Sequence, residues 1–172
     1  MPFSGKSEAV KIAKERGIPV IRMGDMVWDE VRSRGLELCD ENVGYVANEM
    51  RKTHSKNIWA QRTVDKIKST DTKNALIIDG IRNVEEIDFF KEKLGSDFKV
   101  IAIVVSDSVR HNRAMSRGRE DDSRDIDLIK KRDERELGWG LGDVIKSADI
   151  KISNENGIEE FRKEIKKNLD EI

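Results

Sequence analysis

The stretch that decides the fold is Ser4-Gly5-Lys6-Ser7, near the start of a chain of 172 residues. It matches the end of the pattern G-x-x-x-x-G-K-[ST], in which backbone N–H groups surround phosphates, the Lys reaches the β- and γ-phosphate oxygens and the hydroxyl binds Mg²⁺. A helical pattern from Ser7 to Arg16 follows, closed by Gly17, and would add a positive dipole at the loop. The tripeptide alone also fits a solvated turn, but the helix behind it favours a loop that binds ATP.

In this loop we expect Lys6 to be a catalytic cation and Ser7 to be a ligand of Mg²⁺. The residues expected to contact ATP here are Met1, Pro2, Phe3, Ser4, Gly5, Lys6 and Ser7. The first Gly of the pattern would precede Met1, and the strand that leads into the loop would precede that Gly. We therefore expect the functional protein to start upstream of Met1, and the first central strand of the sheet to be absent from this chain.

Two apolar stretches, residues 75–79 and 99–105, have the pattern of buried parallel strands, because they are continuous and rich in β-branched residues. Residues 18–21 and 148–152 are shorter candidate strands. Helical patterns alternate with them, as at residues 83–94 and 158–169. In the last helix, one face carries Ile158, Phe161, Ile165 and Leu169. This alternation predicts an α/β fold with a parallel sheet flanked by helices.

Two stretches depart from the alternation. Residues 25–70 look helical throughout, and residues 116–138 hold many Arg and Asp with few apolar positions. We expect both to be insertions in a single domain rather than separate domains. The core of that domain would then comprise residues 1–24, 71–115 and 139–172.

The composition narrows the class of protein and its compartment. Acidic and basic residues balance to a net charge of -1, so overall charge gives no indication of a nucleic-acid or membrane partner. Cys39 is the single cysteine, which excludes a disulfide within one chain and fits a reducing cytoplasm. The sequence contains no apolar run as long as a membrane span and no export signal. We expect a cytoplasmic protein that does not bind membranes.

Asp79 and Arg82 lie where a parallel strand would end, in Asp79-Gly80-Ile81-Arg82. A carboxylate at the carboxyl end of such a strand faces the ligand crevice, so Asp79 is a candidate Mg²⁺ ligand. Arg82 would reach a substrate phosphate and is a candidate catalytic residue. The alternative is a helix-capping Asp followed by a surface Arg.

Asp25 follows the first predicted strand in Met23-Gly24-Asp25, at the same edge of the sheet. Its carboxylate would accept a proton from an attacking hydroxyl or hold a Mg²⁺-bound water, so we count it as a candidate catalytic residue. An N-cap role is equally natural at this position.

Arginines recur at helical spacing after the strand at 99–105. Those at 110, 113 and 117 share one face, Arg119 follows, and Arg132 and Arg135 repeat the spacing. Guanidinium groups that converge on a transferring phosphate are what phosphoryl transfer requires, since its charge spreads over three oxygens. A salt-bridged surface helix is the equal alternative.

The turn from Asn154 to Gly157 would place backbone groups beside a purine, or would simply lead into the last helix. His54 and His111 have no metal-ligand spacing and are expected at the surface. The three tryptophans are expected to pack the insertions. They are Trp28, Trp59 and Trp139.

In these residues and the segments around them, the chain resembles the nucleoside monophosphate kinase family, both adenylate kinase and dephospho-CoA kinase. MGDMVWDEV (23–31) is similar to the segment that opens the phosphate-acceptor subdomain, and DGIRNVEE (79–86) to an Asp-Gly-Phe-Pro-Arg segment without its Pro. ADIKISNENGIEEFRKEI (148–165) resembles the dephospho-CoA kinase ending, and RGREDD (117–122) a short lid. Over essentially the whole chain, including WGLGDVIKSAD (139–149), the closest resemblance is to an archaeal group of adenylate-kinase-related P-loop proteins.

This resemblance implies an acceptor-side helical insertion near 25–70 and a lid near 116–138. It implies that Arg117 and Arg119 close over the phosphates as catalytic residues, and that Asn154 and Gly157 border the adenine of ATP. It also places the strand before the phosphate loop between the strands at 75–79 and 99–105.

The sequence therefore predicts a kinase that transfers the γ-phosphoryl group of ATP, with Mg²⁺, to a nucleotide-like acceptor. The acceptor stays open, because features of two kinases with different acceptors are mixed here. The alternative is an ATPase or a regulatory switch that acts on a partner and has no small-molecule acceptor.

Overall fold

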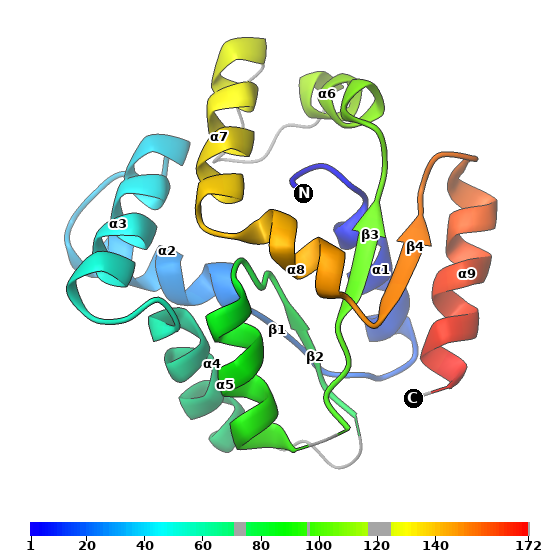
Figure 1. Ribbon diagram of the computed structural model, residues 1–172, viewed down its shortest axis with the longest axis horizontal. Coiled ribbons are helices and arrows are strands. Elements are labelled where there is room, and N and C mark those ends of the chain that lie inside the picture. The colour runs from blue at the N-terminus through cyan, green and yellow to red at the C-terminus, as the bar shows by residue number, and fades with distance from the viewer. Residues whose placement is uncertain (71–74, 96, 117–124, 172) are drawn as a thin grey trace.

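The computed structural model describes residues 1–70, 75–95, 97–116 and 125–171 and has an α/β fold (Figure 1). Its strands are β1 (Val20–Arg22), β2 (Ile77–Asp79), β3 (Ile101–Val104) and β4 (Ile150–Ser153). β1 pairs with β2 and β3 with β4, both in parallel, with Val20 opposite Ile77 and Ile101 opposite Ile150. The four predicted strands and their parallel pairing are confirmed.

The strands form two sheets rather than one. Their orders are β1-β2 and β3-β4, and within the described residues no ladder of hydrogen bonds joins β2 to β3. The break falls between the same two strands where the resemblance places the strand before the phosphate loop. Helices, rather than a continuous sheet, therefore connect the two halves.

The β3-β4 half packs against α1 (Lys6–Glu15) and α9 (Ile158–Asp170). Figure 1 shows α9 beside β4, and α1 behind β3 and β4 in this view. The apolar face of α9 buries Phe161, Ile165 and Leu169. Ile158 lies on the same face but begins the helix and is 46% exposed. α1 ends as predicted, where Gly17 adopts a φ of 73° that favours glycine.

The β1-β2 half carries four helices around a separate apolar core. They are α2 (Met23–Ser33), α3 (Asp40–Thr53), α4 (Ile58–Lys68) and α5 (Val84–Leu94). Trp59 of α4 is fully buried at the centre of this core with Val31, Val46 and Phe90. The helical prediction for residues 25–70 is confirmed in α2–α4. α5 starts where predicted, because the Asn83 side chain accepts a hydrogen bond from the Glu86 N–H at 2.8 Å.

Three further helices join the two halves: α6 (Asp107–Ser116), α7 (Ile126–Gly138) and α8 (Leu141–Ser147). α7 stands beside α3 in Figure 1 and ends next to α8, which packs on α5. Ile129 of α7 packs with Phe3 of the N-terminal segment and Ala114 of α6. No helix in the described part of the chain is long and apolar enough to span a bilayer.

Candidate functional site

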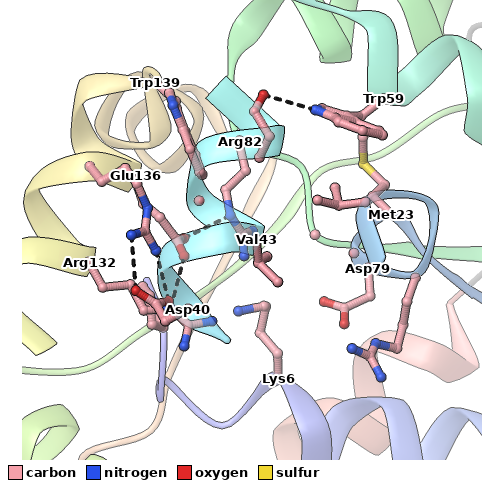
Figure 2. A pocket seen from close by; sticks show the side chains of 18 of the residues that line it. Lys6, Met23, Asp40, Val43, Trp59, Asp79, Arg82, Arg132, Glu136 and Trp139 are labelled. Atoms are coloured by element: carbon pink, nitrogen blue, oxygen red, sulfur yellow. Dashed lines mark hydrogen bonds and ion pairs between the residues drawn. The ribbon is translucent and has the colours of Figure 1, made fainter. Parts of the chain in front are cut away.

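A cavity lies where the N-terminal loop, α2, α3, α7 and the end of β2 meet (Figure 2). It contains about 1040 Å³ of space, including solvent at its mouth. Its described lining carries six cations, namely Lys6, Arg22, Arg51, Arg82, Arg132 and Arg135, against the carboxylates of Asp40, Asp79 and Glu136. This excess of positive charge suits a ligand with several negative charges.

The predicted phosphate loop forms one end of the cavity. Gly5 is the N-cap of α1 and has a φ of 107°. The Asn154 side-chain amide donates to the Ser4 carbonyl at 2.9 Å, and a Cβ at Gly5 would lie 2.2 Å from the same amide nitrogen. Position 5 therefore needs glycine both for its backbone angle and for the close approach of Asn154.

The loop is held from its other side by a buried arginine. Arg110 of α6 donates to the Pro2 carbonyl at 3.3 Å and to both oxygens of Asp133 of α7 at 2.9 and 2.7 Å. His111, predicted at the surface, is partly buried with Nε2 3.1 Å from Asp133. Phe3, the next residue of the loop after Pro2, is buried and has a φ of 59°, which is uncommon for a residue with a side chain.

Lys6 extends from the start of α1 into the cavity. Figure 2 shows its amine between the Asp79 carboxylate and the group of charged side chains around Asp40. Burial and the nearby Arg82 lower the pKa of Lys6 to about 8, against the opposing effect of Asp79. A phosphate at this position would favour the charged amine and relieve that cost.

Asp79 and Ser7 line the same end of the cavity as Lys6. Asp79 is the last residue of β2, opposite Arg22 of β1, so its side chain projects from the carboxyl end of the strands. A hydroxyl, a carboxylate and a lysine around one cavity fit a phosphate-bound Mg²⁺, which takes oxygen ligands and keeps several waters.

Arg82 and Arg132 meet at Glu136 of α7. The Arg82 Nε lies 2.7 Å and the Arg132 Nε 3.5 Å from the two oxygens of Glu136. Burial raises the pKa of the Glu136 carboxyl, but Arg82, Arg132 and Lys6 together bring it below its usual value. Glu136 is therefore an ionised carboxylate that fixes two arginines, and no pattern in the sequence marked it.

Arg51 and Trp139 form the end of the cavity farther from the loop. The Arg51 guanidinium lies 4.4 Å from the centre of the Trp139 ring and donates to the buried Glu86 at 3.0 Å. Burial lowers the pKa of Arg51, which Glu86 opposes. Arg51 is thus a fixed cation, and no local motif marked it in the sequence.

The opposite side of the cavity is apolar. Met23, Val43 and Trp59 face it in Figure 2, and Val27 and Ala47 complete it. Trp59 is held in place because its Nε1 donates to the Ala47 carbonyl at 3.2 Å. Such a surface beside fixed cations can hold the apolar body of a ligand while the cations bind its anionic groups.

Other predicted residues lie elsewhere. Asp25 does not belong to the described cavity lining; it is in the first turn of α2, 3.5 Å from Arg22, and the N-cap of that helix is Arg22. Asn154 and Gly157 lie behind the loop at the start of α9, and Gly157 is its N-cap. Arg117 and Arg119 lie outside the described residues. The roles predicted for these residues stay predictions.

Comparison with known proteins places the chain in a family. It is 42% identical over 165 residues to a UPF0200 protein of Methanosarcina barkeri, covering 96% of this chain and 88% of that protein. It is 41% identical over 172 residues to a UPF0200 protein of Hyperthermus butylicus, covering 100% and 91%. The chain belongs to the UPF0200 family.

A second comparison concerns the domain. A family model described as an AAA domain matches residues 1–130, which include the loop, α2–α5 and β1–β3. This UPF0200 member therefore carries a P-loop nucleotide-binding domain, and the predicted likeness to an archaeal group of P-loop proteins is confirmed. The relation to adenylate kinase stays a prediction.

Proposed function

We propose that the protein is a kinase that transfers the γ-phosphoryl group of ATP to a small, nucleotide-like acceptor. The observation that carries the proposal is that one cavity joins two differently built ends. Lys6 and Asp79 line the end at the loop, and fixed arginines and tryptophans from α3, α4 and α7 line the other. One nucleotide would use the cations and carboxylate at the loop end. The arginines and tryptophans at the other end would then be free to bind a second ligand, the acceptor.

In this proposal Lys6 binds the β- and γ-phosphate oxygens, and Ser7 and Asp79 hold Mg²⁺ directly or through water. When bound, Mg²⁺ neutralises charge on the phosphates. Arg82 and Arg132, which Glu136 fixes, are placed to stabilise the transferring phosphoryl group. Arg117 and Arg119 would add to them from the lid.

The acceptor would lie against Val43 on the apolar side of the cavity, with Arg51 and Arg135 as cations for its anionic group. An acceptor oxygen then attacks the γ-phosphorus, and the bond to the bridging oxygen breaks to leave ADP. We accordingly assign residues 25–70 to an acceptor-side unit, 116–138 to a lid, and the remainder to the core.

An ATPase or a regulatory switch without a small-molecule acceptor is the second candidate. The position of Asp25 favours it over transfer to a hydroxyl, since that transfer needs a carboxylate beside the acceptor and Asp25 is turned to Arg22. A switch would use ATP hydrolysis to move α7 against a partner protein.

A turnover screen separates the two candidates. Full-length protein is incubated with Mg-ATP alone, or with one nucleoside monophosphate or dephospho-CoA at a time, and ADP is measured. ADP that forms only with a particular acceptor supports the kinase, and the phosphorylated acceptor should equal the ATP consumed, so that AMP as acceptor yields two ADP for each ATP. ADP that forms at the same rate without any acceptor overturns the kinase in favour of the ATPase.

A further inference from the structure

Asp40 is a carboxylate in the cavity that the proposed reaction does not use. It is the first residue of α3, and it reaches α7 on the other side of the cavity. Arg135 binds both of its oxygens, at 3.0 and 2.8 Å, and the Arg132 Nε lies 3.4 Å from one of them (Figure 2). We refer to Asp40, Arg132 and Arg135 as the α3–α7 ion-pair cluster.

The packing around this cluster leaves room for the arginine. A Cβ at Gly44, one turn after Asp40, would lie 2.7 Å from the Arg135 guanidinium. That guanidinium also lies 5.7 Å from the centre of the Trp139 ring. Gly44 therefore lets Arg135 approach the α3 backbone closely enough to bind Asp40 with both nitrogens.

The geometry of the cluster is that of an arginine fork around an anion. Carboxylate and phosphate oxygens bind guanidinium groups in the same bidentate manner, so Asp40 occupies a position that a phosphate oxygen would also fit. Glu136 pairs with Arg82, and it also contacts Arg132, which thus lies between the carboxylates of Glu136 and Asp40. An anionic ligand that reaches Arg135 therefore meets Asp40 as a competitor.

We propose that Asp40 is an internal competitor for the anionic group of the ligand, and that this group binds by displacing Asp40 from Arg132 and Arg135. The inference rests on the proposed function in so far as the ligand carries phosphate. It adds that binding separates the ion pair between α3 and α7, so occupation of the cavity frees these helices to move. Asp40 thus lowers affinity for single anions and links binding to the position of α7.

The test compares Asp40→Asn with wild type in binding inorganic tripolyphosphate and ATP, by calorimetry at low salt. The neutral amide cannot hold two arginines as a carboxylate does, so we expect both anions to bind about tenfold more tightly to the variant. Asp40→Glu keeps the carboxylate and should bind as wild type does. Where Asp40→Asn does not fold, Asp40→Ser replaces it, since serine also suits the first turn of a helix.

Two carboxylates on the same helix serve as controls. Glu41 shares the first turn of α3 with Asp40 but does not belong to the described cavity lining, so Glu41→Gln reproduces the loss of charge at the helix dipole. Glu49 pairs with Arg34 at 3.0 Å away from the cavity, so Glu49→Gln reproduces the loss of an arginine pair. Neither should change anion affinity.

Each result decides the inference. The inference is supported if Asp40→Asn binds the anions more tightly than wild type while the control variants do not. This holds also where the affinity of wild type is too weak to measure. Equal or weaker binding by the variant overturns it, as does the absence of anion binding in both proteins. Failure of the proposed function is distinguishable, because it would appear as anion binding without transfer of phosphate from ATP to any acceptor.

Discussion

The two ends of the cavity are built in different ways. At the loop end, Lys6 and Asp79 come from a short motif and from the end of one strand, and both were predicted from local sequence. At the other end, Asp40 and Arg135 meet from positions 95 residues apart, and Arg51 meets Glu86 across 35. The loop end thus depends on local geometry, whereas the second half of the cavity depends on how α3 and α7 pack.

Arg110→Met should have the largest effect, because it breaks the connection between the two ends. Arg110 is 1% exposed and links Pro2 of the loop to Asp133 of α7. Removing it leaves the buried Asp133 carboxylate with His111 as its remaining partner in the described part of the chain, so the free energy of unfolding should fall by about 3–5 kcal/mol. Urea denaturation followed by circular dichroism measures this.

The double variant Arg110→Met with Asp133→Leu is the control for that change. Since an apolar pair leaves no buried charge, it should recover most of the lost stability. A double variant as unstable as Arg110→Met alone would contradict the assignment of the loss to an unpaired carboxylate.

Lys6→Ala tests the loop end alone. A phosphate in the cavity would lose its nearest loop cation, so ATP should bind about 100-fold more weakly, by calorimetry on full-length protein. Lys11→Ala on the same helix is the matched control, because Lys11 is exposed and pairs loosely with Glu15 at 3.9 Å. An unchanged dissociation constant in Lys6→Ala would remove the loop from the ATP site.

The sequence predicted the fold well where structure is decided by nearby residues. Continuous β-branched runs identified β2 and β3, shorter apolar stretches indicated β1 and β4, and Asn83 and Gly17 marked helix ends through their own backbone preferences. No hydrogen-bond ladder joins β2 to β3 in the described chain, and the resemblance places the strand before the phosphate loop between these two strands. Ile158 shares the apolar face of α9 yet is exposed, and periodicity cannot predict this because it does not say how far a neighbouring sheet extends.

The far end of the cavity could be predicted only in part. The repeated spacing of Arg132 and Arg135 was visible, but spacing alone cannot distinguish a pair with Glu136 or Asp40 from a surface ion pair. Nothing near Asp40 or Gly44 in sequence indicates that α7 lies opposite them. Their partners are fixed by tertiary packing, so a single sequence carries no signal for them.

Asp79→Asn separates metal binding from nucleotide binding. The amide is a poorer Mg²⁺ ligand, so the affinity for ATP in the presence of Mg²⁺ should fall about 30-fold. Binding of metal-free ATP should change little, since the variant loses no cation. Asp88→Asn on the exposed face of α5 is the control, and equal losses with and without Mg²⁺ would make Asp79 a structural residue.

The smallest effect concerns pH, and it distinguishes the lysine end from the arginine end. Burial and Arg82 lower the pKa of Lys6 to about 8, so its amine is charged at pH 7 and loses its proton as the pH rises through 8. Phosphate prefers the charged amine, and about one molecule in ten carries it at pH 9, so metal-free ATP should bind about tenfold more weakly there than at pH 7. The arginines at the other end keep their protons throughout this range.

Lys6→Arg serves as the reference for this prediction, because it retains a cation in the loop. Its affinity for ATP should not fall between pH 7 and 9 beyond what other groups contribute. Calorimetry on both proteins over this range measures the difference, and two parallel curves would mean that the charge of Lys6 does not set the affinity for phosphate.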